Sequence, residues 1–154
     1  MPRIDTASRV IHASPGAVYR AWLDPQALIA WLPPAGMTGR VDRFEPHADG
    51  AYVLTLTYDD ATISGKAGAN TDVVHGKFTL LIPDRLIEQQ VVFASPDPAF
   101  AGTMTMTWTL TATDDGTEVT VTCTDVPEGI GADDHLAGIG STLENLAAHL
   151  ETRG

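Results

Sequence analysis

Residues 103–112 constrain the fold of this chain more than any other stretch, because apolar residues and threonines alternate strictly along them. A period of two predicts a β-strand with one face in the core and the other towards water. After the turn residues Asp114, Asp115 and Gly116, the same alternation returns over residues 117–124. The two runs therefore predict an antiparallel hairpin in matching register, with Cys123 as a buried core thiol.

Turn chemistry divides the rest of residues 39–124 into further strands. Clusters of proline, aspartate and glycine at 46–50, 58–61, 83–85 and 96–98 separate the apolar runs. Together with a strand over residues 3–13, this predicts a seven-stranded antiparallel sheet. Residues 64–72 are small and polar, so we expect an exposed loop there.

Helices are predicted at two places. Ser14 before Pro15, and Asp24 before Pro25, each combine a capping side chain with a proline in the first helical turn, so two short helices follow the first strand. Apolar residues three or four apart over 136–150 predict a C-terminal helix of about five turns. Only the concave face of a curved sheet can cover that apolar stripe. The order predicts an α+β helix-grip fold, with the sheet wrapped around the long helix.

Composition narrows the class of protein. The 154 residues, 44% of them apolar, predict one domain spanning residues 1–154. The formal charge of -11 disfavours nucleic acid and anionic membranes as partners. No apolar run is long enough to insert into a membrane, the N-terminal residues have no apolar signal core, and the single Cys123 excludes an internal disulfide. We therefore expect a soluble, cytoplasmic protein.

Four short patterns follow one another along nearly the whole chain. They are Ser14, Pro15, Val18 and Trp22 running into Asp24, Pro25 and residues 28–32; residues 44–46 followed by 49–52; residues 76–78 followed by 83–86; and residues 116–119 followed by His135, Gly138, Leu143 and Leu146. The series resembles the START-like superfamily, also called SRPBCC or birch-pollen-allergen-like. Within it, the series is most similar to the branch named for the activator of the heat-shock protein 90 ATPase.

The resemblance implies a hydrophobic cavity between the long helix and the sheet. Relatives use it to hold lipids, sterols or polyketides, and some branches catalyse cyclisation or dehydration there. Two residues depart from the branch pattern. Asp49 stands where the branch commonly has a glycine, a change that affects only a turn. Ile139 stands where the branch has a tryptophan, and we expect this smaller side chain to enlarge or reshape the cavity.

The residues expected around this cavity are mostly apolar strand residues. We place Trp31 and Phe44 near its mouth and Ile139 and Leu143 as its lid. Ordinary core packing is the alternative for each of them. The full predicted ligand-binding set is Trp31, Phe44, Tyr52, Leu54, Leu56, Tyr58, Phe78, Leu80, Gln89, Met104, Met106, Trp108, Ile139 and Leu143.

Polar residues that could enter the cavity decide whether chemistry occurs there. A buried histidine or glutamate could act as a general acid or base. The candidates are His75, Glu88, Gln89, Gln90, Tyr52 and Tyr58. Residues 86–94 form a strand of which only one face can point inward, and we favour Gln89 inward, with His75, Glu88 and Gln90 in solvent as the alternative.

Other catalytic templates do not fit. The five histidines show no metal-binding pair and a single cysteine builds no thiolate cage, so we expect neither a metal nor a cofactor. A buried Cys123 is a poor nucleophile because an apolar site raises the pKa of its thiol. His135 sits beside Asp133 and Asp134, and we expect it to cap or pack against the helix start rather than catalyse.

Three functions remain in competition. The leading hypothesis is a small binding protein that holds a hydrophobic or amphipathic molecule, lipid- or polyketide-like, in the cavity. The second is a cyclase or dehydratase working in the same cavity, motivated by His75 and Gln89. The third is a module that binds a chaperone or another protein through the sheet edge; the family name suggests it, but that name comes from one domain of a larger activator. A homodimer through an exposed strand edge also stays open.

Overall fold

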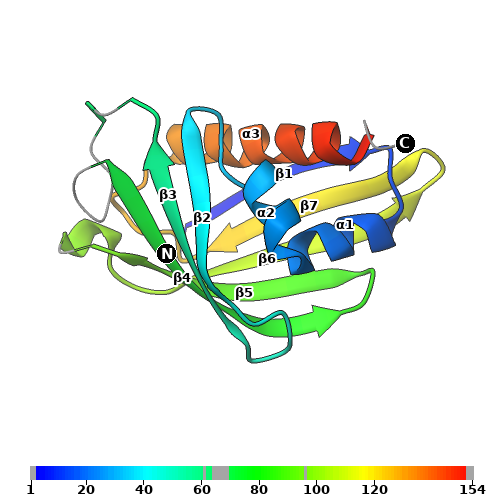
Figure 1. The fold of residues 1–154 in the computed structure, drawn as a ribbon, viewed down its shortest axis with the longest axis horizontal. Coiled ribbons are helices and arrows are strands. Elements are labelled where there is room, and N and C mark those ends of the chain that lie inside the picture. Colours follow the sequence, from blue (N-terminus) through cyan, green and yellow to red (C-terminus); the bar gives the residue numbers. More distant parts are fainter. Residues whose placement is uncertain (1–2, 61, 64–69, 96, 152–154) are drawn as a thin grey trace.

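The computed structural model describes residues 3–60, 62–63, 70–95 and 97–151. Its core is one antiparallel sheet with the strand order β1-β7-β6-β5-β4-β3-β2 (Figure 1). The strands are β1 (Ile4–Ile11), β2 (Met37–Phe44), β3 (Ala51–Tyr58), β4 (Thr71–Ile82), β5 (Leu86–Ala94), β6 (Met104–Thr113) and β7 (Gly116–Thr124). The predicted seven-stranded sheet and α+β helix-grip fold are confirmed.

Two short helices follow β1, as predicted. In α1 (Pro15–Leu23), the Ser14 hydroxyl accepts a hydrogen bond from the backbone N–H of Ala17 at 3.1 Å. In α2 (Pro25–Trp31), Asp24 Oδ1 accepts from the N–H of Gln26 at 3.0 Å. Each cap satisfies a donor that the first helical turn leaves free, so the boundary between the helices is set by local sequence. A short turn of 3₁₀ helix, η1 (Pro98–Phe100), precedes β6.

The β6–β7 hairpin has the register that the alternating residues predict. Trp108 pairs with Val121, and Met106 pairs with Cys123. Trp108, Val121 and Cys123 are all buried, whereas Thr109 is exposed. One face of the hairpin therefore lies in the core, and Cys123 is a core thiol as predicted.

The C-terminal helix α3 (Ala132–Glu151) runs along β1, while α1 packs against β6 (Figure 1). Hydrogen bonds attach α3 to the connector between α2 and β2. Thr142 Oγ1 donates to the carbonyl oxygen of Leu32 at 2.9 Å, and Asn145 Nδ2 donates to that of Pro33 at 2.9 Å. The connector is thereby fixed against the middle of α3, at the side of the sheet that α3 covers.

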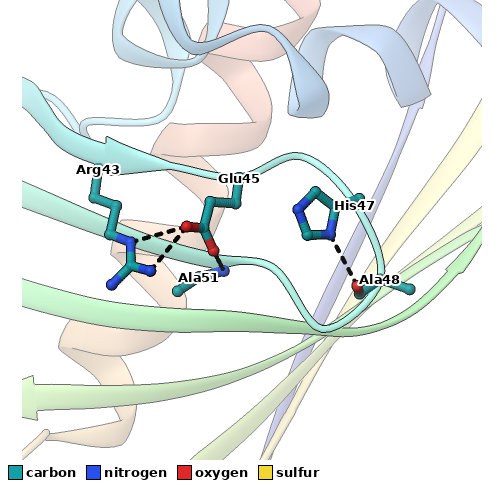
Figure 2. A network of polar contacts seen from close by, with 5 residues as sticks. All are labelled: Arg43, Glu45, His47, Ala48 and Ala51. Atoms are coloured by element: carbon teal, nitrogen blue, oxygen red, sulfur yellow. Dashed lines mark hydrogen bonds and ion pairs between the residues drawn. The ribbon is translucent and has the colours of Figure 1, made fainter.

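The turn between β2 and β3 is organised by one carboxylate (Figure 2). Glu45 accepts from the backbone N–H of Ala51 at 2.9 Å and forms an ion pair with Arg43 at 2.8 Å. Asp49 in the same turn has a φ of 65°, a conformation that aspartate tolerates better than most residues. Asp49 therefore adopts the left-handed conformation that a glycine would favour at this position of the turn.

Strand β4 differs from the sequence-based expectations at its start and at a bulge near its end. It begins at Thr71, and Asp72 is only 4% exposed, so the expected exposed loop over 64–72 is wrong for these last two residues. Residues 64–69 lie outside the described residues. A register shift between Phe78 and Leu80 interrupts the inward and outward alternation, so Phe78 is buried and Leu80 is 43% exposed.

No helix in the described part of the chain is both long enough and apolar enough to cross a membrane.

Candidate ligand-binding cavity

A cavity of about 350 Å³ lies between the inner face of the sheet and α3. Most of its wall is apolar, and its deep end is formed by Trp22 and Trp108, which are 1% and 2% exposed. Ala35 and Asp134 also line it and are exposed, so the cavity reaches the surface near the start of α3. The predicted residues that line it are Tyr52, Leu54, Leu56, Tyr58, Met104, Met106, Trp108 and Ile139.

The other predicted residues lie outside the cavity wall, for different reasons. Leu80 points to solvent because of the β4 register shift. Trp31 is fully buried and donates its indole N–H to the carbonyl oxygen of Ala21 at 3.2 Å, so it does not stand at a mouth. Phe44 packs against Phe78, with ring centroids 5.8 Å apart. The predicted residues that serve as surrounding core are Trp31, Phe44, Phe78, Gln89 and Leu143.

Aromatic rings close the deep end. Trp22 lies edge-on to Trp31 at 5.6 Å and to Trp108 at 5.4 Å, and Phe78 approaches it at 6.4 Å. Edge-to-face contacts of this kind add to the stabilisation from buried area. Trp31, expected near the mouth, is therefore part of this buried cluster, and the cavity opens instead where Ala35 and Asp134 are exposed.

Gln89 points inward, as predicted, but as part of the core. Its Oε1 accepts a hydrogen bond from the Tyr52 hydroxyl, and its side chain is fully buried. Burial raises the pKa of Tyr52, so this hydroxyl stays protonated and acts as the donor.

Four polar residues line the surface end of the cavity: Tyr58, Asp72, Asp134 and His135, here called the polar end. Tyr58 ends β3, Asp72 lies beside it near the start of β4, and the two others lie in the first turn of α3. Burial first, and then the charges of Asp72 and Asp134, raise the pKa of Tyr58. The cavity is therefore amphipathic along its length, with acidic groups at one end only.

His135 forms a pair with Asp5, a residue of β1. Its Nδ1 lies 2.6 Å from Asp5 Oδ2, and Arg3 Nη2 reaches the same oxygen at 3.1 Å. Burial raises the pKa of Asp5, but the hydrogen bonds from His135 and Arg3 outweigh it and lower that pKa below its ordinary value. The ionised carboxylate thus holds the imidazole against the cavity wall. His135 therefore packs near the start of α3, as expected, and it also lines the cavity.

The remaining polar candidates lie elsewhere. His75 is exposed, between the inward-facing Val74 and Gly76, so it lies on the outer face of the sheet and cannot act in the cavity. Glu88 accepts a hydrogen bond from Thr79 Oγ1 at 2.9 Å, and Gln90 is exposed. Among the described residues, no three histidine, cysteine, aspartate or glutamate side chains gather as metal ligands would.

Several lining residues were missed by the sequence analysis. The alternation in their strands could have identified Val74, Val91 and Phe93, whereas the connector residues Leu32, Pro34 and Ala35 carry only a turn signal. The missed residues are Trp22, Leu32, Pro34, Ala35, Met37, Asp72, Val74, Val91, Phe93, Val121, Ile130, Asp134, His135, Gly138 and Thr142.

Solved structures of bacterial proteins share this architecture. A protein from Chromobacterium violaceum is 29% identical, with a TM-score of 0.85 and coverage of 96% of both chains. A Mesorhizobium loti protein is 21% identical, with a TM-score of 0.75 and 99% coverage of each chain. The AHSA1-like protein from Aeromonas hydrophila is 18% identical, with a TM-score of 0.74, over 99% of this chain and 94% of that one. The last two likenesses concern the fold alone.

Family membership follows from the sequence match. The comparison with curated proteins found no match for this chain. The family model described as "Activator of Hsp90 ATPase homolog 1-like protein" matches residues 12–151, which is most of the chain and includes all three α-helices and the strands β2 to β7. The protein therefore belongs to the family of activator of Hsp90 ATPase homolog 1-like proteins, of the SRPBCC type.

Proposed function

We propose that this protein binds a hydrophobic or amphipathic small molecule, lipid- or polyketide-like, in the cavity between its sheet and α3. The observation that carries the proposal is the cavity itself. Its volume of about 350 Å³ lies within the range of small-molecule sites, and aromatic, aliphatic and methionine side chains form most of its wall. Met104 and Met106 provide flexible surface that adapts to ligand shape.

An energetic argument favours an occupant. Water makes few hydrogen bonds against an apolar wall, whereas an apolar ligand makes dispersion contacts along all of it. Ligand binding is then coupled to the stability of the fold.

The enzyme reading has less support. It depends on His75 and Gln89, but His75 is exposed to solvent and Gln89 is hydrogen-bonded to Tyr52. A chaperone-binding module would need no internal cavity. The binding function is therefore the one that uses the cavity.

The test is a titration of delipidated protein with phenylnaphthylamine, a neutral apolar fluorophore. We expect saturable binding of one molecule per chain, displaced by decane. Fluorescence that rises without saturation, or that decane does not reverse, would contradict the proposal. Native mass spectrometry of protein purified without detergent then identifies any molecule that is released on denaturation.

A further inference from the structure

Asp5 occupies a position where a strand normally places an apolar residue. It pairs with Cys123 in the sheet, is 4% exposed, and carries a charge that burial makes costly unless it is bonded. Arg3 Nη2 and His135 Nδ1 both reach Asp5 Oδ2, at 3.1 and 2.6 Å. An ionised carboxylate can only accept, so the proton of this bond belongs to Nδ1 of His135. In the neutral ring, Nε2 is then a hydrogen-bond acceptor.

His135 presents this ring at the polar end of the cavity. Its side chain is 14% exposed, and Gly138 and Ile139, one turn further along α3, line the same wall. Tyr58 supplies the second group at this end. Its raised pKa keeps the hydroxyl protonated, so it remains available as a donor. The polar end therefore combines the acceptor Nε2, the carboxylates of Asp72 and Asp134, which also accept, and the Tyr58 hydroxyl, which can donate and accept.

This combination discriminates among the polar groups that an apolar molecule can carry. A carboxylate only accepts, and it would face the like charges of Asp72 and Asp134. An ammonium group only donates, but His135 Nε2 and the Tyr58 oxygen can both accept from it, and the charges of Asp72 and Asp134 attract it. An uncharged hydroxyl group donates and accepts, and it brings no charge into a partly buried site.

Building on the proposed function, we infer that the cavity selects apolar molecules with a hydrogen-bond-donating head group, a hydroxyl or an amine, over apolar carboxylates. That head group donates a hydrogen bond to His135 Nε2, and a hydroxyl also accepts one from Tyr58. Asp5 is a positioning residue, because it fixes the ring and touches no ligand. The apolar wall supplies most of the binding free energy, and the polar end supplies the choice of head group.

The alternative is a purely structural role, in which the pair of Asp5 and His135 only attaches α3 to β1. One substitution distinguishes this structural role from a role in head-group binding. In His135→Asn, the amide nitrogen can replace Nδ1 as the donor to Asp5, but nothing replaces Nε2. A purely structural role predicts unchanged ligand binding in this variant. A head-group role predicts weaker binding of molecules with a donating head group, and unchanged binding of decane. His12→Asn is the matched control, because His12 is exposed, contacts the Asp115 carbonyl oxygen at 3.0 Å and does not line the cavity.

The probes are decane, decanol, decanoate and decylamine, which share one chain and differ in head group. Binding is measured by displacement of phenylnaphthylamine from the wild-type protein and both variants. We expect decanol and decylamine to bind more tightly than decanoate. His135→Asn weakens decanol about tenfold, the equivalent of one hydrogen bond, and leaves decane unchanged. Tyr58→Phe gives the same pattern and replaces His135→Asn if that variant does not fold.

Unchanged decanol affinity in His135→Asn, or tighter binding of decanoate than of decanol, overturns the inference while the proposed function stands. Equal losses for decane and decanol also overturn it, because they show a change in cavity shape. If no probe binds to the wild-type protein, the proposed function itself fails.

Discussion

Tyr52 on β3 reaches over the intervening strand β4 and donates its hydroxyl hydrogen to Gln89 on β5. The crossing depends on Gly76, which pairs directly with Tyr52 in the sheet. A Cβ atom at Gly76 would lie 2.0 Å from Cζ of the tyrosine ring. Gln89 is fully buried and Tyr52 is 2% exposed, so this hydrogen bond joins β3 to β5 across β4 within the core.

Gly76→Ala tests the crossing. The added methyl group would displace the Tyr52 ring and break its bond to Gln89, so we expect the free energy of unfolding to fall by about 3 kcal/mol. Urea denaturation measures it. The control is Gly138→Ala, where a Cβ meets nothing within 4 Å, and we expect that variant to gain up to about 1 kcal/mol of helix propensity. Equal stability of the two variants would show that the Tyr52 ring moves aside at little cost.

Tyr52→Phe isolates the hydrogen bond from the packing of the ring. It leaves Gln89 Oε1 buried without its donor, which should cost about 1–3 kcal/mol in the free energy of unfolding. Adding Gln89→Leu removes the unsatisfied amide, and we expect the double variant to be more stable than Tyr52→Phe alone. A double variant that is less stable than the single one would argue that Gln89 has another role in the core.

Cys123 gives a prediction on pH. Burial first, and then the charge of Asp5, raise the pKa of its thiol from 9.0 to about 12. The folded state therefore keeps the proton while the unfolded chain releases it, so stability is lost as the pH rises from about 9 to about 12. We expect the free energy of unfolding to decline over this range more steeply in the wild-type protein than in Cys123→Ala. Parallel pH profiles would contradict the shift.

Thiol labelling checks the same burial by a second route. Cys123 should react with an uncharged maleimide only as fast as the protein unfolds, because the thiol is buried and protonated near neutral pH. Addition of urea to the unfolding midpoint accelerates the reaction sharply. Rapid labelling in native buffer would place the thiol in reach of solvent.

The architecture was predictable because each of its elements carries a local periodic signal. The alternation on β6 and β7 determines which face is buried, the stripe on α3 requires a covering surface, and the cap-plus-proline pairs at Ser14 and Asp24 define two helices. The alternation along β5 also predicts that Gln89 points inward, and Gln89 is fully buried. These features depend on residues close together in the sequence.

The candidate site was only partly predictable, since its composition depends on contacts between distant residues. The bulge after Phe78 reverses the direction of Leu80, and no turn residue signals it. The polar end joins His135 to Asp5, which lies 130 positions away in the sequence. The back-folding of α1 and α2 moves Trp31 from the expected mouth into the core. Such arrangements follow from tertiary packing, which local patterns do not encode.

The central claim, that the cavity holds an apolar molecule, is tested most directly by phenylnaphthylamine titration of Gly138→Leu and Gly140→Leu. A Cβ at either glycine of α3 meets nothing within 4 Å, so both variants can fold, but only Gly138 lines the cavity. We predict that leucine at position 138 occupies the cavity and weakens saturable binding at least about tenfold, whereas leucine at position 140 leaves it unchanged. Equal binding by the two variants would contradict the account.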